Sequence, residues 1–439
     1  MKQAIKVTIL ISLLASVLCG CSIHTINELY CLPMRSEEYT GLRSAIDQIM
    51  TGREYSAPIS GENRQTVQST DLNGDGIAEY ILFSKSLDEK PLQLSIFALS
   101  GEDYILLDMI EFSGSAFDQI EYVQMDDRPG MEIVVGIQVS DQVLRSVSIH
   151  SLANGQMEQV MSSGYTKFLC SDLDHDNLAE LLILRPGSEA PNNGIAEMFG
   201  FEGGTIERSP EINMSGAAEN IKRIMLGTLN DGTRAMYVAS SLDSNTLITD
   251  IYAVVNGAFT NVSCSNESGT SMQTLRNYYV FADDIDGDGV LELPSLITMN
   301  TTDDNGAEQQ YLIRWFAMTS QGEEVNKQFT YHNFVGGWYL QFDEEIAARI
   351  TVTPKGNSYE FSVWDESLSQ TEKLFTIYVL TGQKREEQAA TDNRFIVRKS
   401  DTTIYAGNLE VNSASYGISK ESLIQSFRLI LQNWKTGEI

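Results

Sequence analysis

Three copies of one short acidic segment constrain the fold of this 439-residue chain more than any other feature. They span Asp71–Glu79, Asp172–Glu180 and Asp284–Glu292, and each has carboxylate or amide side chains at positions 1, 3, 5 and 9. Gly or Asn stands at position 6, where such a segment must turn. Oxygen ligands at alternate positions around a sharp turn suit a hard cation such as calcium. The recurrence itself predicts a repeat protein.

Position 12 separates these segments from EF-hand loops. The residues there are Leu82, Ile183 and Ser295, so the bidentate Glu of an EF-hand is missing. Asn177 replaces Gly at position 6 of the second copy, and Asn tolerates a positive φ. A metal-free alternative is also open. In it the segments are Asx-type turns, whose side chains accept backbone N–H groups.

Two degenerate copies lie between the complete ones. Residues 122–132 keep the final Glu132 and the strand after it, whereas residues 228–236 keep only the turn and the following strand. Strand-like runs flank each copy, and two more apolar runs follow, which makes four strands in a period of about 50 residues. The pattern predicts a mainly β chain, with a β-propeller of about five blades over residues 64–333.

The Asp-x-Asp/Asn-x-Asp-Gly-x-x-Glu segment resembles the FG-GAP (integrin-α-type) repeats of extracellular β-propellers, over roughly residues 64–333. The resemblance implies calcium sites, with backbone carbonyl ligands from Ile77, Leu178 and Val290. The implied side-chain ligands are Asp71, Asn73, Asp75 and Glu79; Asp172, Asp174, Asp176 and Glu180; and Asp284, Asp286, Asp288 and Glu292. The whole chain also resembles uncharacterised propeller-bearing lipoproteins of anaerobic Firmicutes.

The period is lost after about residue 333. Alternating strands followed by a helix predict a small α+β domain over residues 334–439. We expect the closing helix to run from about Lys420 to Trp434, with Ser419 as its N-cap. The alternative continues the repeat to the C-terminus and makes seven blades in all.

Residues 1–20 have the pattern of a processing signal. Two lysines precede the apolar stretch Val7–Leu18, which is too short to span a bilayer. The stretch ends in Leu-Cys-Gly-Cys, which resembles the bacterial lipobox. The resemblance implies cleavage after Gly20 and lipidation of Cys21 with acyl chains such as palmitate. The protein is then expected outside the cytoplasm, anchored to the cell membrane.

The segment 21–63 is expected to be a tether that ends in a short helix. Ser36 can cap this helix, and Leu42 and Ile46 fall on one face at helical spacing.

The charge balance narrows the range of partners. Thirty Lys and Arg stand against sixty Asp and Glu, which gives a net charge of −30. Such a field repels nucleic-acid phosphates and attracts divalent cations. Nucleic-acid binding is therefore excluded, and the only membrane contact expected is the lipid anchor.

Thiol and zinc chemistry have no support in the sequence. The cysteines left after processing, Cys31, Cys170 and Cys264, are odd in number and widely spaced, and no C-x-x-C pair occurs. The four histidines form no metal-binding motif.

No catalytic motif is visible either. Neither a G-x-S-x-G elbow nor a phosphate-binding glycine loop occurs. Three tryptophans, Trp315, Trp338 and Trp364, could stack on sugars, but core packing is favoured.

The leading hypothesis is a non-enzymatic, lipid-anchored cell-surface propeller. It would serve as a calcium-stabilised binding scaffold for protein or glycan partners. Two alternatives remain: an envelope enzyme that acts on polysaccharide or phosphoester, and an accessory subunit of an envelope complex.

Overall fold

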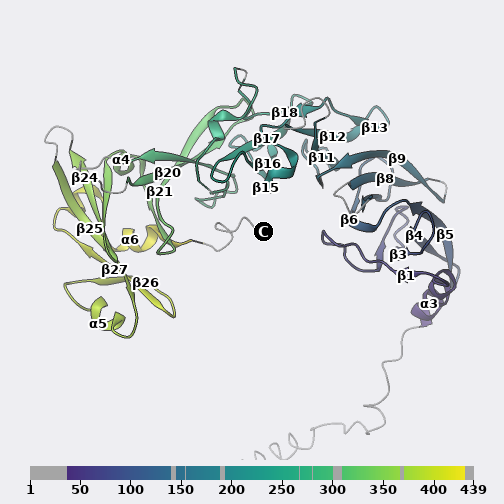
Figure 1. Ribbon diagram of the computed structural model, residues 1–439, viewed down its shortest axis with the longest axis horizontal. Coiled ribbons are helices and arrows are strands. Elements are labelled where there is room, and N and C mark those ends of the chain that lie inside the picture. Colours follow the sequence, from purple (N-terminus) through teal and green to yellow (C-terminus); the bar gives the residue numbers. More distant parts are fainter. Residues whose placement is uncertain are drawn as a thin grey trace, which may run out of the picture. The chain divides into compact units, whose positions relative to one another are not determined.

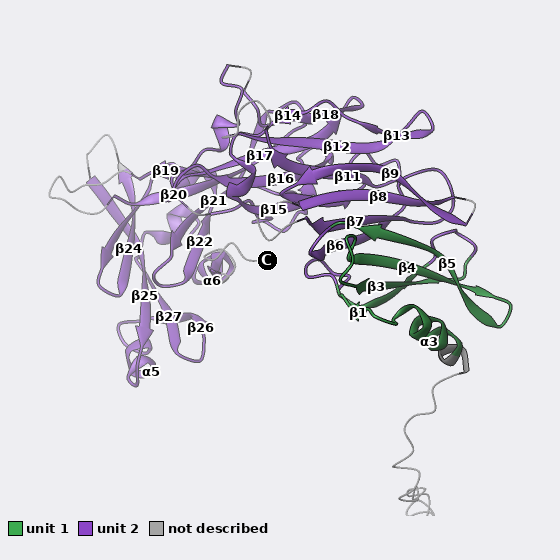
Figure 2. Ribbon diagram, turned by 45° about the vertical axis from the view of Figure 1, so that its right-hand side comes forward, with its two compact units in different colours: residues 1–57, 65–70, 76–113 green, residues 58–64, 71–75, 114–439 purple. Residues whose placement is uncertain are grey.

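The computed structural model forms two compact units (Figure 2). Unit 1 comprises residues 1–57, 65–70 and 76–113, and unit 2 comprises residues 58–64, 71–75 and 114–439. The structure describes residues 37–139, 145–153, 155–187, 193–265, 267–278, 280–299, 309–365 and 370–430. The predicted signal segment, Cys21 and Cys31 therefore lie outside the described residues.

Unit 1 is one antiparallel sheet with a helix against it. The sheet runs in the order β1-β3-β4-β5, and β2 also pairs with β3. Leu42 and Ile46 of the helix are buried with Phe97 and Tyr104 of the sheet, which confirms the predicted apolar face. The elements are α3 (Glu37–Ile49), β1 (Glu54–Tyr55), β2 (Val67–Thr70), β3 (Glu79–Lys85), β4 (Leu92–Ser100) and β5 (Asp103–Phe112).

The described residues of unit 2 form five antiparallel sheets that follow one another along the chain (Figure 1). The β6–β9 sheet contains β6 (Ala116–Val123), β7 (Glu132–Gln138), β8 (Arg145–Ala153) and β9 (Gln156–Tyr165). The β10–β14 sheet contains β10 (Lys167–Ser171), β11 (Glu180–Pro186), β12 (Gly194–Glu202), β13 (Thr205–Arg208) and β14 (Ile212–Asn213). The β15–β18 sheet contains β15 (Ile221–Thr228), β16 (Arg234–Ser241), β17 (Leu247–Val255) and β18 (Ala258–Asn261).

The last two sheets complete unit 2. The β19–β22 sheet contains β19 (Leu293–Thr298), β20 (Tyr311–Met318), β21 (Glu324–Asn333), β22 (Trp338–Phe342) and, paired with β22, β28 (Phe427–Leu429). The β23–β27 sheet contains β23 (Ile350–Lys355), β24 (Ser358–Asp365), β25 (Gln370–Thr381), β26 (Phe395–Lys399) and β27 (Thr403–Leu409). Short helices are η1 (Ala218–Asn220), η2 (Met272–Thr274), α4 (Glu344–Ala347), α5 (Arg385–Ala389), η3 (Ser413–Tyr416) and α6 (Lys420–Ser426).

Neighbouring sheets of unit 2 pack face to face through strands that are buried on both sides. In β11, Leu181 and Ile183 join the core shared with the β6–β9 sheet. Leu182 and Leu184 point the other way and join the core shared with the β15–β18 sheet. Side chains alternate between the faces of a strand, so a continuous apolar run indicates a strand covered on both faces.

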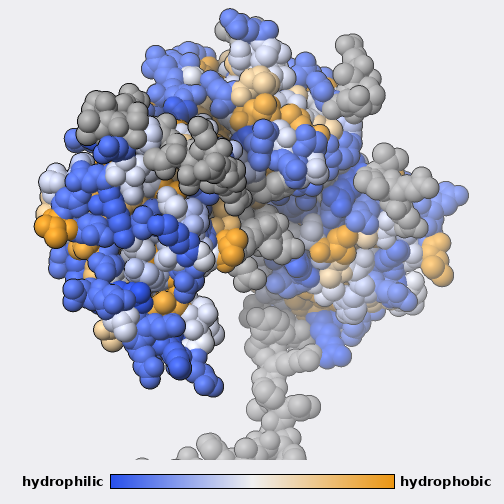
Figure 3. Space-filling model, turned by 60° about the vertical axis from the view of Figure 1, so that its left-hand side comes forward, coloured by the Kyte–Doolittle hydropathy of each residue, from blue (hydrophilic) through white to orange (hydrophobic). Residues whose placement is uncertain are grey.

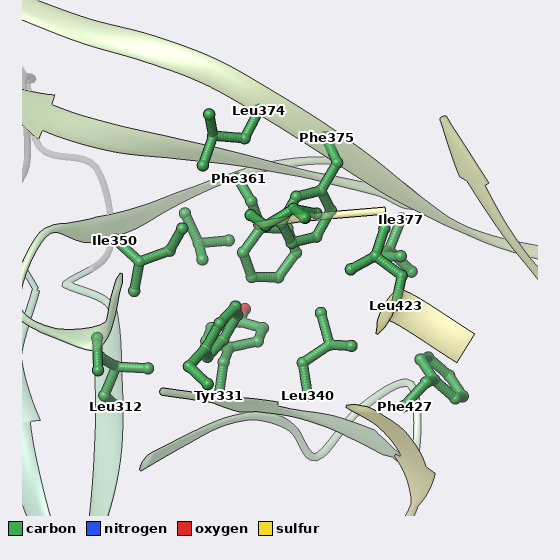
Figure 4. Packing of buried hydrophobic residues seen from close by; sticks show 14 of the residues in the cluster. Leu312, Tyr331, Leu340, Ile350, Phe361, Leu374, Phe375, Ile377, Leu423 and Phe427 are labelled. Carbon is green, nitrogen blue, oxygen red and sulfur yellow. The ribbon is translucent and has the colours of Figure 1, made fainter. Parts of the chain in front are cut away.

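The largest core lies between the β19–β22 and β23–β27 sheets (Figure 4). The rings of Phe361 and Phe375 stack with centroids 4.5 Å apart, and Tyr331 meets Phe361 edge-on at 5.4 Å. Trp338 is fully buried there, and Trp315 is fully buried nearby within the β19–β22 sheet. The prediction that these two tryptophans pack in the core is confirmed.

Two predicted elements differ from the structure. The strand-like run expected before the third acidic segment, residues 278–282, forms no strand in its described part, and the nearest pairing is a single bridge between Asp283 and Glu292. The closing helix α6 begins after the Ser419 cap as predicted but ends at Ser426. It stops there because Phe427–Leu429 pairs with β22, which places the Phe427 ring against Trp338 at 5.5 Å.

The mainly β class is confirmed, whereas no closed propeller is identified in the described residues. The expected domain boundary at residues 333 and 334 falls between β21 and β22, which are paired neighbours in one sheet. Within the described residues, no helix is long and apolar enough to cross a membrane.

Candidate metal centre

The three acidic segments and the two degenerate copies lie at equivalent places in five sheets that succeed one another along the chain. Loop one (71–79) joins β2 to β3, and loop two (172–180) joins β10 to β11. Loop three (284–292) leads directly into β19. The two degenerate copies join β6 to β7 and β15 to β16. Each segment therefore precedes a strand that pairs with the third strand of the same period, as a blade repeat requires.

One hydrogen bond recurs across the copies in unit 2. The position-9 carboxylate accepts the backbone N–H of position 2. The N–O distance is 2.7 Å for Leu173 and Glu180, 2.9 Å for Ile285 and Glu292, and 2.8 Å in the degenerate copy that ends at Glu132. The position-2 side chains are apolar and buried. The position-2 residue thus holds the loop in two ways. Its apolar side chain is buried in the core, and its backbone N–H donates to the position-9 glutamate.

Side chains at the earlier positions hold the turn. In loop three, Asp284 Oδ1 accepts the N–H groups of Gly287 and Asp288, and its Oδ2 accepts that of Gly289. In loop two, Asp172 Oδ1 accepts the N–H of His175 at 2.7 Å. These are the hydrogen bonds of the predicted Asx-type turns, so turn formation and metal binding use the same residues.

The turn needs left-handed backbone at positions 4 and 6. Gly occupies both positions in loops one and three, and each of these glycines has a positive φ. Loop two places His175 at φ 68° and Asn177 at φ 71° there instead. The predicted tolerance of Asn177 for positive φ is confirmed, and His175 is exposed in the turn.

Loops two and three each bring three carboxylates together in a group that could hold a metal ion. Asp172, Asp174 and Glu180 form one group, and Asp284, Asp286 and Glu292 form the other. Within each group, one carboxylate oxygen per residue lies within 4.8 Å of those of the other two. Six of the predicted side-chain ligands are therefore gathered as expected.

The remaining predicted ligands are placed as follows. Asp176 and Asp288 lie in the same turns, where each accepts the N–H of the position-7 residue, Leu178 or Val290. In loop one, Asp71 accepts the N–H of Gly74 and Asn73 that of Asp75, while Glu79 is buried and Ile77 is half exposed. The carbonyl ligation expected of Ile77, Leu178 and Val290 stays a prediction.

The position-9 glutamates are electrostatically unfavourable in the absence of a cation. Burial, together with the charges of the neighbouring aspartates, raises the pKa of Glu180 and of Glu292 to about 7. Glu292 is fully buried, and its Oε1 has no hydrogen-bond partner in the described residues. A bound divalent cation would satisfy this oxygen and offset the repulsion, so the residues present fit a metal ion.

Two basic side chains contact the loops, and sequence reasoning missed both. Lys327 Nζ lies 2.6 Å from Asp288 Oδ2, which lowers the pKa of Asp288. Arg234 Nη1 lies 2.7 Å from the carbonyl oxygen of Asp172 and 3.2 Å from its Oδ2. Arg234 belongs to the degenerate copy 228–236. That copy has no acidic loop of its own, and it contributes a basic side chain to loop two.

In the degenerate copy 122–132, residues 124–132 correspond to positions 1–9, and this part contains its own cation. Arg128 takes position 5, where the complete copies have Asp, and its guanidinium donates to Asp126 and to Ser151 Oγ. Ser151 in turn donates to Glu132 Oε1 at 3.0 Å. Asp126 and Glu132 are both buried, so the guanidinium provides the positive charge that a metal ion would provide in loops two and three.

The other titratable groups singled out from the sequence are two buried histidines and two half-buried cysteines. His150 and His332 are almost fully buried, and burial lowers their pKa values to about 4 and about 3, so both stay neutral at pH 7. Cys170 and Cys264 are free thiols, and burial raises the pKa of each. These features support no thiolate or imidazole chemistry.

Comparison with known proteins identifies no family. No family model matches the sequence, and no curated protein matches it. The structure is similar to the crystal structure of the exotype rhamnogalacturonan lyase YesX, at 12% identity and TM-score 0.29, with 74% of this chain and 65% of that chain covered. The rhamnogalacturonan lyase YesW matches at 10% identity and TM-score 0.27, with 73% and 64% covered. The chain thus spans less than two thirds of either lyase, and these TM-scores carry no argument about activity.

Replacing Arg128 should destabilise the fold whether or not calcium is present. Arg128→Ala leaves Asp126 and Glu132 buried without their cation, and we expect a loss of about 1–2 kcal/mol, because the guanidinium itself is half exposed. Urea unfolding in calcium and in chelator measures this. Equal losses in both buffers are expected, and a loss that calcium removes would contradict the role given to Arg128.

The metal-free protein should lose stability as Glu292 ionises. Its pKa of about 7 lies above the ordinary 4.5, so folding takes up a proton between these pH values. The contribution of the protonated carboxyl is complete below pH 4.5 and is lost as the pH rises to about 7. In chelator, the stability of the wild type relative to Glu292→Gln should therefore fall by about 2 kcal/mol across this window. If the stability of the wild type and that of Glu292→Gln changed equally with pH, this would contradict the raised pKa of the buried Glu292 carboxyl.

Proposed function

We propose that this protein is a lipid-anchored, extracytoplasmic binding scaffold of β-propeller type, in which structural calcium holds the blade loops and the partners are proteins or glycans. The observation that supports it best is the recurrence of one carboxylate cluster at equivalent places in the β10–β14 and β19–β22 sheets. In loop three the cluster includes a fully buried glutamate oxygen without a hydrogen-bond partner in the described residues.

Calcium fits the ligand chemistry of these loops. Each offers carboxylate oxygens together with a backbone carbonyl at position 7, and calcium takes six to eight oxygen ligands in flexible geometry. Magnesium requires near-ideal octahedral geometry and keeps its waters, which a short one-sided loop provides less readily. The net charge of −30 further concentrates divalent cations around the chain.

The position of the loops supports a structural role for the ion. In loop two the ligands come from the turn between β10 and β11 and from Glu180, the first residue of β11. An ion there would link the turn to β11, the strand whose two faces pack into the cores shared with both neighbouring sheets. Calcium would therefore rigidify the end of a blade and the surface that its loops present.

The anchor is the second part of the proposal. Cleavage after Gly20 and lipidation of Cys21 would hold the scaffold at the outer surface of the cell membrane. Expressed in a bacterial host with labelled palmitate, the wild type should incorporate label and Cys21→Ser should not. Cys31→Ser is the matched control and should be labelled normally. Label in the Cys21→Ser protein would contradict the predicted lipobox.

Calcium should raise the melting temperature of the purified protein. At a hundredfold excess over the dissociation constant, one occupied site contributes about 2.7 kcal/mol of stability. Asp284→Ala removes a ligand from loop three and should reduce the calcium-dependent shift without abolishing the contribution of loop two. Asp103→Ala, an exposed acid of β5, is the matched control and should keep the full shift. Identical melting in calcium and in chelator would exclude the metal and leave the Asx-type turns as the explanation.

A further inference from the structure

A cleft of about 460 Å³ lies in unit 2 at one end of the β19–β22 sheet. Its walls include Tyr311, where β20 begins, and Asn333, where β21 ends. Phe334 in the turn after β21 and Tyr359 at the start of β24 complete the rim. Figure 2 shows β19–β22 and β24 on the same side of this unit. The volume is within the range of small-molecule and sugar sites.

The lining of the cleft is uncharged. None of the described residues that line it is Asp, Glu, Lys or Arg, although one residue in five of the chain is charged. His332 lines the cleft as well, and burial lowers its pKa to about 3, so it adds no charge at neutral pH. A charged ligand would lose its hydration here without an opposite charge in return, so the lining favours a neutral one.

Aromatic rings are exposed around the opening. Tyr311 is 43% exposed and Phe334 is 40% exposed, in a structure where most rings are buried. The Phe334 ring is supported by His332, with centroids 5.5 Å apart. The surface visible in Figure 3 is mainly hydrophilic, with scattered hydrophobic patches. Supported, half-exposed rings present flat apolar faces on which the C–H face of a sugar ring can stack.

Polar groups that suit sugar hydroxyls lie beside the rings. The Tyr278 hydroxyl is buried and has no hydrogen-bond partner in the described residues. Gln309 donates through Nε2 to the carbonyls of Met299 and Gln310, which leaves its Oε1 as an acceptor. Asn333 accepts the Gly336 N–H through Oδ1, which leaves its NH₂ as a donor. A buried hydroxyl without a partner costs free energy that a ligand hydrogen bond would recover.

We propose that this cleft binds a neutral saccharide chain, with Tyr311 and Phe334 as stacking platforms and Tyr278 and the amides as hydrogen-bonding groups. The assignment names one ligand class for the scaffold and rests on the proposed binding function. It does not depend on calcium, because none of the predicted metal ligands lines the cleft.

The first test is affinity electrophoresis of the purified protein in native gels that contain soluble galactan, mannan, xylan or mixed-linkage glucan. At least one neutral polymer should retard the wild type, and acidic polygalacturonate should not. Tyr311→Ala and Phe334→Ala should each weaken the binding about tenfold. Tyr55→Ala, another exposed tyrosine at 54%, is the matched control and should bind like the wild type. Absence of retardation by every neutral polymer, or wild-type binding by both cleft variants, would overturn the proposal.

A second variant separates ligand binding from folding. Tyr278→Phe removes only the hydroxyl, which has no hydrogen-bond partner among the residues that the structure describes, so the melting temperature should stay the same or rise. Its affinity for the neutral polymer should nevertheless fall several-fold. Unchanged affinity would overturn the role of Tyr278.

Gels and melting curves in calcium and in chelator distinguish this proposal from the metal sites. Retardation without a calcium-dependent melting shift would support the cleft and refute structural calcium. A melting shift without retardation would overturn the cleft and leave the metal sites intact.

Discussion

The hydrogen bond from the position-2 amide to the position-9 glutamate is the interaction on which the repeated loops depend. It brings a carboxylate into the base of a turn that already contains two or three others, and it buries that carboxylate. Burial and repulsion raise the pKa of Glu180 and Glu292 to about 7. The same contact that closes the loop therefore creates a site that requires a positive charge.

The copies in unit 2 meet this requirement in three ways. Loops two and three keep the acidic cluster, which we propose is filled by calcium. The copy 124–132 keeps the glutamate and places the guanidinium of Arg128 beside it. The copy 228–236 loses the glutamate altogether, and the buried Ala235 stands at the equivalent place in the strand, paired with Gly227 as Glu180 is paired with Ser171. Each degenerate copy of unit 2 thus either has an internal cation beside its buried glutamate or lacks that glutamate, because a buried carboxylate kept without a cation would destabilise the fold.

Much of this could be predicted from the sequence because it depends on local patterns. The acidic spacing, the positive φ at Asn177 and the Ser419 cap are all set within a few residues, and the structure has them as predicted. The strand-like runs that follow the acidic segments were also predicted, and Leu181–Leu184 lies in one of these strands, β11. Local patterns decide element type when they agree with the packing.

What could not be predicted depends on contacts between distant residues. Helix α6 ends early because Phe427 pairs with β22 and stacks on Trp338, 89 positions before it (427 − 338). Lys327 and Arg234 reach the loops from other strands, and no sequence signal marks them. Arg128 did carry a signal, since a basic residue at position 5 of a copy that keeps its Glu indicates an internal cation. The cleft beside Tyr311 is likewise assembled from segments far apart in the chain.

Isothermal titration calorimetry of the purified protein would show whether the acidic loops bind calcium through their position-9 glutamates. We expect two or more calcium sites in the wild type and the loss of one site in Glu292→Gln, with Arg128→Ala unchanged in stoichiometry. No calcium heat in the wild type, or the same number of sites in Glu292→Gln, would contradict it.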